Sequence, residues 1–141
     1  MSDGGTGYAQ TSVNTTIFRQ SSVITHGDYQ FAAYYDADGY VVLAKRKLAK
    51  KGKDGDWQVQ RTQYKGNVRD AHNIISIGID GDGFIHVSFD HHGHPLRYCK
   101  SKQPLSLELG ELQPMNGNDE RNVTYPEFYN LLDGDLLFAY R

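Results

Sequence analysis

An acidic, glycine-containing turn that recurs along the chain constrains its fold most strongly. The turn precedes a short apolar run at residues 36–42, 80–86 and 133–138. The starts are 44 (80 − 36) and 53 (133 − 80) residues apart, and the blades of a β-propeller recur at roughly 40–50 residues. The repeat therefore predicts an all-β fold, a partial β-propeller of about three blades of four-stranded antiparallel sheets. A plain antiparallel sandwich is the alternative.

The composition and the local pattern agree with strands. Glycine (15) and tyrosine (10) are frequent among the 141 residues, and Val-, Ile- and aromatic-rich runs bounded by turn residues are typical of strands. We expect strands at residues 16–25, 30–35, 40–48, 57–64, 73–79, 84–90, 96–100, 127–131 and 136–141. A closed propeller needs at least about four blades. Residues 1–141 are therefore expected to form one partial propeller domain, the N-terminal portion of a longer propeller, whose exposed blade edges offer sites for self-association.

Charge and hydropathy exclude several classes of function. The formal net charge is −2, so the chain lacks the basic character that binds nucleic acid or an anionic membrane. No apolar run approaches the ~20 residues of a membrane-spanning helix, and the N-terminus lacks the basic and apolar regions of a signal peptide. The single cysteine, Cys99, excludes an internal disulfide and is expected to be a small buried hydrophobe.

Histidines concentrate in a predicted hairpin between residues 70 and 98. A three-residue loop at 81–83, with glycine at its left-handed position, would pair Asp80 with Phe84. One face is then wholly apolar, with the pairs Ile75 and Phe89, Ile77 and Val87, and Ile79 and Ile85. The other face carries His86 and pairs Ile74 with Asp90. It sets His72 opposite His92, with Cβ atoms about 5 Å apart. A slip of one residue would bury polar groups, so the pattern selects this register.

The histidine pair has three interpretations. Histidine titrates near neutral pH, so His72 and His92 suit general acid and base chemistry. With Asp90 or His86 they could instead bind a metal such as Zn or Ca, although the spacing matches no strong zinc pattern. The third interpretation is structural, with ordinary hydrogen bonds on a polar sheet face. In the same register His91 turns toward the apolar side, and two further histidines, His26 and His94, are expected in loops.

Several segments resemble the BNR repeat-containing family, which includes ulvan lyases built as seven-bladed propellers. They are Asp-Ala-His-Asn at 70–73, Asp-Gly-Asp-Gly at 80–83, His-Val-Ser-Phe-Asp-His-His-Gly at 86–93, Pro-Leu-Arg-Tyr at 95–98, Val-Thr-Tyr-Pro-Glu-Phe at 123–128 and Asp-Gly-Asp-Leu-Leu-Phe-Ala-Tyr-Arg at 133–141. The resemblance extends over most of the chain from about Gly7, and the block at 70–98 is its most specific part. The chain is shorter than such a propeller, so the remaining blades and their part of the substrate groove are missing.

The resemblance implies β-elimination on a uronic-acid polysaccharide such as ulvan. Lyases of this type use two histidines, a tyrosine and an arginine. By motif His72 matches the first histidine, and His92, or else His91, matches the second. Tyr125 matches the tyrosine and Arg141 the arginine. In these roles the arginine would neutralise the uronate carboxylate, while the tyrosine or a histidine would act as base and the other as acid.

The same resemblance implies further features. The candidate substrate-binding residues are His91, Asn73, Arg97 and Tyr98. The partner would be an acidic polysaccharide, no cofactor would be required, and the protein would be secreted or periplasmic. Two alternative functions stay open. One is a sialidase-like glycoside hydrolase, although the nearest candidate motif, at 54–57, lacks the Ser-x-Asp-x-Gly pattern. The other is a non-catalytic glycan-binding propeller.

Overall fold

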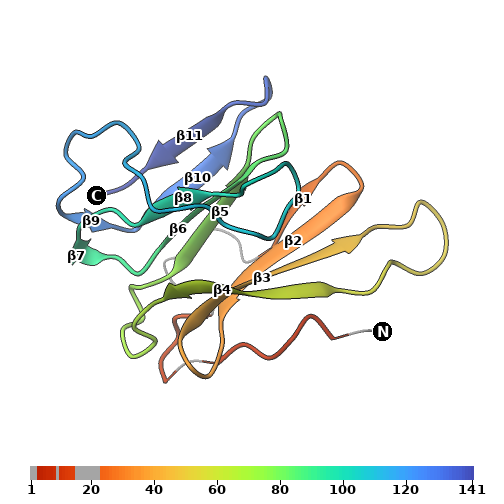
Figure 1. The fold of residues 1–141 in the computed structure, drawn as a ribbon, viewed down its shortest axis with the longest axis horizontal. Helices are drawn as coiled ribbons and strands as arrows, with labels where there is room; N and C mark the ends of the chain where they lie inside the picture. The colour runs from red at the N-terminus through yellow and green to blue at the C-terminus, as the bar shows by residue number, and fades with distance from the viewer. Residues whose placement is uncertain (1–2, 9, 15–22) are drawn as a thin grey trace.

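Eleven strands and no helix make up the described part of the chain in the computed structural model, which covers residues 3–8, 10–14 and 23–141 (Figure 1). The strands are β1 (Val23–His26), β2 (Tyr29–Tyr35), β3 (Tyr40–Lys47), β4 (Gln58–Lys65), β5 (Ile75–Ile79), β6 (Ile85–Phe89), β7 (His92–His94), β8 (Tyr98–Lys100), β9 (Val123–Thr124), β10 (Glu127–Asn130) and β11 (Leu136–Ala139). Across these residues, no helix is long and apolar enough to cross a membrane. The all-β prediction is confirmed.

The strands form antiparallel sheets that succeed one another across the molecule (Figure 1). The first sheet has the order β1-β2-β3-β4, the second β5-β6-β8, the third is the hairpin β10-β11, and a short ladder joins β7 to β9. Among the described residues, only the first sheet has the four strands predicted for every blade. In the second, a single bridge between Ser101 and Leu109 follows β8. A left-handed φ of 56° at Leu105 interrupts the extended chain between them.

The predicted turn repeat closes three hairpins of the same construction. Each loop carries a glycine with positive φ, namely Gly39 (79°), Gly83 (85°) and Gly134 (94°). The same backbone hydrogen bond closes each loop, in which the N–H of the first residue donates to the carbonyl four residues ahead: Asp36 to Tyr40 (3.0 Å), Asp80 to Phe84 (3.1 Å) and Leu131 to Asp135 (2.9 Å). In the third hairpin, the residue equivalent to Asp36 and Asp80 is therefore Leu131 and not Asp133. The distance from the second turn to the third is then 51 (131 − 80) residues. The three turns therefore align at the glycine in the left-handed conformation, which glycine adopts without strain. They do not align at their acidic residues.

Strand boundaries agree with the prediction in most of the longer strands and differ in the short ones. β2, β3, β4, β6 and β10 begin and end within one residue of their predicted bounds. Of the predicted strand at 16–25, residues 16–22 lie outside the described residues. The loop placement of His26 and His94 is wrong, because His26 ends β1 and His94 ends β7. The unpredicted strands β7 and β9 have three and two residues, too few to show an alternating pattern.

The core lies between the first and second sheets. All five pairs of the β5–β6 ladder have the predicted register, from Ile75 with Phe89 to Ile79 with Ile85. The six side chains of the predicted apolar face are at most 5% exposed. They belong to one buried cluster with Phe31 of β2, and this cluster includes Cys99, which is buried as predicted. The hydrophobic pattern thus fixes which face of the hairpin is inside.

The third sheet covers the opposite face of β5 along a seam formed by Gly78, Gly81, Phe128 and Gly134. Every residue of β5 is buried. Gly78 leaves room for Phe128 of β10, since a Cβ at Gly78 would lie 2.7 Å from the Cβ of Phe128. At the hairpin tips, the N–H of Gly81 donates to the carbonyl of Gly134 (2.7 Å). The face predicted to be polar is therefore an interface between two sheets.

The substitution Gly78→Ala is expected to lower the free energy of unfolding by about 1–3 kcal/mol, the range for an extra methyl group in a packed interior. The atom it meets is the β-carbon of Phe128, which cannot rotate away. Urea unfolding measures the change. Gly7→Ala is the matched control, because a Cβ there meets nothing closer than 3.5 Å. Unchanged stability in Gly78→Ala would contradict the close packing along the seam.

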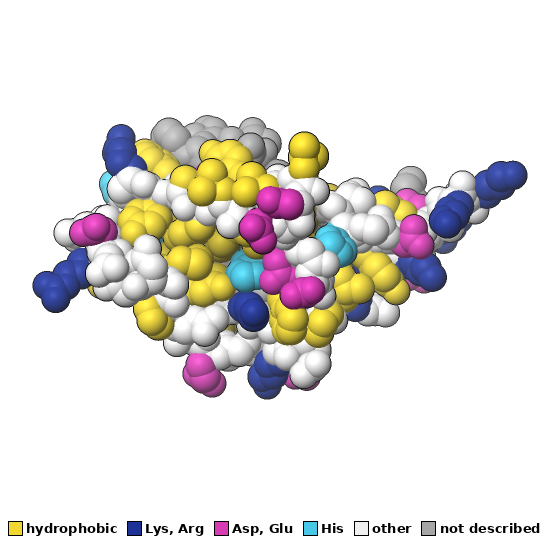
Figure 2. Space-filling model, turned by 90° about the horizontal axis from the view of Figure 1, so that it is seen from above, with side chains coloured by type: hydrophobic (Ala, Val, Ile, Leu, Met, Phe, Trp, Pro, Cys, Tyr) yellow, Lys and Arg dark blue, Asp and Glu magenta, His cyan; other side chains and the backbone are white. Residues whose placement is uncertain are grey.

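Hydrophobic and basic side chains are exposed on two outer parts of the molecule (Figure 2). Large hydrophobic side chains are exposed on the β10–β11 hairpin, namely Tyr129, Leu131, Leu132 and Leu137. The hairpin between β3 and β4 projects from the other end (Figure 1) and carries exposed Lys50, Lys51 and Lys53.

Candidate functional site

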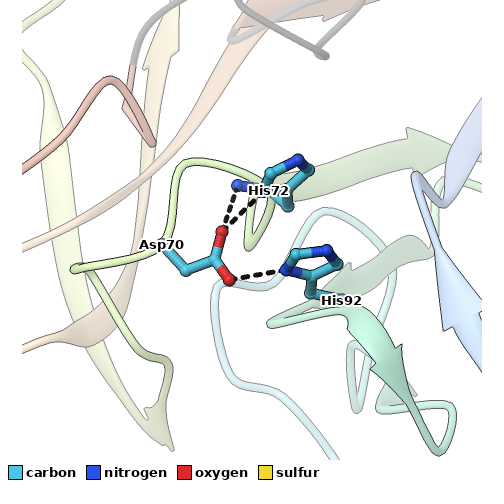
Figure 3. A group of neighbouring side chains, drawn as sticks. All are labelled: Asp70, His72 and His92. Atoms are coloured by element: carbon cyan, nitrogen blue, oxygen red, sulfur yellow. Dashed lines mark hydrogen bonds and ion pairs between the residues drawn. The ribbon is translucent and has the colours of Figure 1, made fainter.

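One carboxylate holds two imidazole rings near the end of the β5–β6 ladder (Figure 3). The Nδ1 of His72 lies 2.7 Å from Oδ1 of Asp70, and the Nδ1 of His92 lies 2.7 Å from Oδ2. The two rings are stacked, with centroids 4.0 Å apart and planes 20° apart. The predicted neighbourhood of the two histidines is confirmed, whereas Asp70 is a member that the sequence analysis did not single out.

The histidines meet by a route that differs from the predicted strand pairing. Asp90 has a left-handed φ of 68° and ends β6 at Phe89. The predicted pairs of Ile74 with Asp90 and of His72 with His92 therefore do not form, and Ile74 is fully buried. Instead, His72 lies in the turn before β5, and His92 begins β7.

Asp90 also has partners of its own, away from the histidine pair. Its carboxylate is ion-paired with Arg97 and accepts the backbone N–H of Asn67 (2.7 Å). The carboxylate beside the two histidines is thus Asp70, two residues before His72. An Asp-x-His spacing in a turn is the signal that would have found it, because an aspartate accepts hydrogen bonds from groups two residues ahead in such turns.

Thr124 of β9 brings a tyrosine and an arginine to the histidines. It pairs with His92 in the β7–β9 ladder and exchanges two backbone hydrogen bonds with Arg141 (2.7 and 2.9 Å). The ring of Tyr125, the next residue, has its centroid 5.7 Å from that of His72. The guanidinium carbon of Arg141 lies 5.1 Å from the Tyr125 ring centroid. We call the group of Asp70, His72, His92, Tyr125 and Arg141 the histidine site.

The backbone at Tyr125 adopts a conformation that is rare for a residue other than glycine, with a φ of 54°. A residue before proline, here Pro126, normally stays extended. Such a conformation costs of order 1–3 kcal/mol and persists where the surroundings enforce it, often at functional sites. The strain falls on the residue whose ring lies between His72 and Arg141, which is what a functional constraint would produce.

The histidine site is partly open to solvent. His92 and Arg141 are exposed, and Asp70, His72 and Tyr125 are half-buried. Burial alone would raise the pKa of the Asp70 carboxyl, but hydrogen bonds from the ring of His92 and from the backbone and ring of His72 lower that pKa well below its usual range. Asp70 is therefore ionised at neutral pH and acts only as a hydrogen-bond acceptor.

The four predicted substrate-binding residues are not members of the histidine site, and three of them are buried. His91 is fully buried, and its Nε2 accepts the N–H of Arg97 (2.9 Å). Asn73 is 1% exposed and Tyr98 5% exposed. Their burial gives them packing roles and argues against direct contact with a sugar, whereas Arg97 is half-buried. Between the two candidates for the second histidine, His92 stacks on His72 and His91 points into the interior.

His86 belongs to a separate polar chain, not to the histidine site. Its Nε2 lies 2.9 Å from Oδ2 of Asp80, and its Nδ1 lies 2.8 Å from the hydroxyl of Tyr98. Burial raises the pKa of Tyr98 to about 12. Burial also acts to raise the pKa of Asp80, but the hydrogen bonds from His86 and the backbone of Phe84 lower it. This chain of hydrogen bonds joins the tip of the β5–β6 hairpin to β8, which is a structural role.

The predicted metal-ligand sets with Asp90 or His86 do not form, because both residues are bonded elsewhere. Within the described residues, Asp70, His72 and His92 place one possible ligand atom each within 4.8 Å of one another. A metal ion there would have to replace two short hydrogen bonds. The arrangement is that of a carboxylate orienting two imidazoles, as seen where an outer carboxylate fixes the tautomer of a histidine.

A profile of the BNR repeat-containing family matches residues 29–141. The chain belongs to the BNR repeat-containing family. Its fold is similar to two solved structures of a PL25 ulvan lyase, described as a new family of polysaccharide lyase, one of them bound to -[GlcA(1-4)Rha3S]-. Each aligns with a TM-score of 0.66 at 18% identity, covering 88% of this chain and 32% of the lyase chain. No curated protein matches the sequence.

Membership of the BNR repeat-containing family confirms the resemblance stated from the motifs. The likeness to the ulvan lyase structures establishes the partial β-propeller fold. The chain spans about a third (32%) of the length of these structures. The histidine site, from Asp70 to Arg141, lies entirely within the residues that match the family.

Proposed function

We propose that the full-length protein is a polysaccharide lyase that cleaves a uronic-acid polysaccharide, such as ulvan, by β-elimination. One observation carries the proposal: four side chains far apart in the sequence, His72, His92, Tyr125 and Arg141, come together in one partly open group. The fold likeness to an ulvan lyase bound to a saccharide that contains GlcA, a uronic acid, supports the same class of substrate.

The histidine site holds the groups that β-elimination needs. The guanidinium of Arg141 pairs with the uronate carboxylate, which makes the C5 proton acidic and stabilises the enolate-like charge. Tyr125 or one histidine removes that proton as base. The C4–O bond breaks, a C4=C5 double bond forms, and the remaining proton donor protonates the leaving glycosidic oxygen. The reaction consumes no cofactor and no metal.

The arginines favour this reaction over a sialidase-like hydrolysis, which would need several of them in one cluster. Of the six arginines among the described residues, three are ion-paired with aspartates: Arg46 with Asp54, Arg61 with Asp36, and Arg97 with Asp90. Arg141, by contrast, lies beside Tyr125 at the histidine site. A single arginine is what carboxylate neutralisation in β-elimination requires.

Turnover of uronic-acid polysaccharides by the full-length protein tests the proposal, followed by the ultraviolet absorbance of the unsaturated uronate product. The substitution His72→Ala is expected to lower kcat by ~10²–10⁴-fold, the usual contribution of a general acid or base. His26→Ala is the control, because His26 lies in β1 of the first sheet and should leave kcat unchanged.

Two results would contradict the lyase proposal. One is a folded full-length protein that yields no unsaturated product from ulvan or other uronic-acid polysaccharides. The other is binding of acidic glycans without turnover and with no change in His72→Ala, which would identify a glycan-binding propeller.

A further inference from the structure

We propose that Asp70 is a positioning residue that holds His72 and His92 in the same tautomer, with the proton on Nδ1 and an acceptor electron pair on Nε2 of each ring. The catalytic meaning of this role rests on the proposed function. Each oxygen of the carboxylate lies 2.7 Å from a different Nδ1. Figure 3 shows the second nitrogen of each ring turned away from the carboxylate.

The chemistry of the carboxylate determines where the ring protons are. An ionised carboxylate has no proton to donate, so both hydrogen bonds to it must come from Nδ1–H groups. A neutral imidazole that carries its proton on Nδ1 has an acceptor at Nε2. The rings therefore present basic nitrogens on the side away from Asp70 (Figure 3). The ring of Tyr125 has its centroid 5.7 Å from that of His72.

Asp70 is anchored independently of the two rings. Its Oδ1 accepts the backbone N–H of His72 (2.9 Å), and its backbone carbonyl accepts the N–H of Asn73 (3.2 Å). The turn before β5 thus holds the carboxylate in place through backbone contacts that do not involve either ring. Because His92 comes from a different strand, β7, this one side chain sets the relative orientation of two separate elements.

Nitrogen-15 spectra of histidine-labelled protein test the tautomers directly, at mildly alkaline pH where free imidazoles are neutral. In the wild-type protein, both His72 and His92 are expected to show a protonated Nδ1 and a bare Nε2. In Asp70→Asn, the amide offers one oxygen and one NH₂ group, so one of the two rings is expected to move its proton to Nε2. This measurement does not depend on enzymatic activity.

A matched control and a kinetic readout separate positioning from folding. Asp80→Asn removes a carboxylate that also bonds a histidine, His86, and should leave the tautomers of His72 and His92 unchanged. In the full-length protein, Asp70→Asn is expected to lower kcat by ~10²-fold or more, with little change in KM, as wrong-tautomer variants of other enzymes do.

The possible outcomes distinguish this proposal from the proposed function. A proton on Nε2 of either ring in the wild-type protein, or unchanged tautomers in a folded Asp70→Asn, overturns the role of Asp70 whatever the activity. If Asp70→Asn does not fold, the wild-type spectrum still decides the question. The expected tautomers in a protein without eliminative activity support the positioning and overturn the lyase proposal alone.

Discussion

Removing the hydroxyl of Tyr125 is expected to lower the kcat of eliminative cleavage by ~10²–10⁴-fold, the range for loss of a general acid or base. Tyr125→Phe keeps the ring that lies 5.7 Å from His72 and 5.1 Å from the guanidinium of Arg141. The substrate carboxylate can still bind the arginine, so KM should change much less than kcat. Steady-state kinetics of the full-length protein on a uronic-acid polysaccharide measure both.

The control for Tyr125→Phe is Tyr129→Phe, which removes a hydroxyl from an exposed tyrosine of β10. It should leave kcat and KM unchanged. Wild-type kcat in Tyr125→Phe would show that the tyrosine hydroxyl takes no part in proton transfer, and would leave the base and acid roles to the histidines.

Mild acid is expected to destabilise the fold through His91. Burial first, and then the charges of Arg97 and His94, lower the pKa of this side chain to about 4. In the unfolded chain, histidine titrates near 6.5. Between these values the unfolded state binds more protons than the folded state, so stability is complete above pH ~6.5 and falls as the pH approaches ~4. The shift corresponds to roughly 3 kcal/mol of unfolding free energy.

Urea unfolding at neutral pH and near the lower end of this range measures the loss. His91→Gln, whose side-chain oxygen can accept the N–H of Arg97 in place of Nε2, should flatten the pH dependence, whereas His26→Gln should not. Asp70 and Asp80, whose pKa values are lowered in the folded state, lose their stabilising effect only below the ordinary range of aspartate, near 4. The same slope in His91→Gln and the wild-type protein would refute the assignment.

The hairpin register could be predicted because both strands alternate. Placing Ile75, Ile77 and Ile79 in the core fixes five consecutive pairs, since a slip of one residue would invert the faces. The same rule failed at the next pairs, because Asp90 leaves the extended region. Its two partners, Asn67 and Arg97, come from other segments, and no pattern within the strand reports them.

The members of the histidine site could be predicted in part. Motif resemblance supplied His72, His92, Tyr125 and Arg141, while alternation alone gave only the two histidines. Asp70 was missed because its role depends on both rings at once. The ladder between β7 and β9 was missed because strands of two or three residues carry no periodic signal. That ladder, through Thr124, is what joins the two halves of the site.

The seam between the second and third sheets makes the geometry of the histidine site depend on how neighbouring sheets pack against one another. The hydrogen bond from Gly81 to Gly134 joins the tips of the β5–β6 and β10–β11 hairpins, and at the other end of the seam Thr124 pairs with His92. The two histidines flank the strands of the second sheet, and the tyrosine and arginine flank those of the third. A small change in the packing at this seam would therefore alter the distances within the histidine site while each sheet kept its own fold.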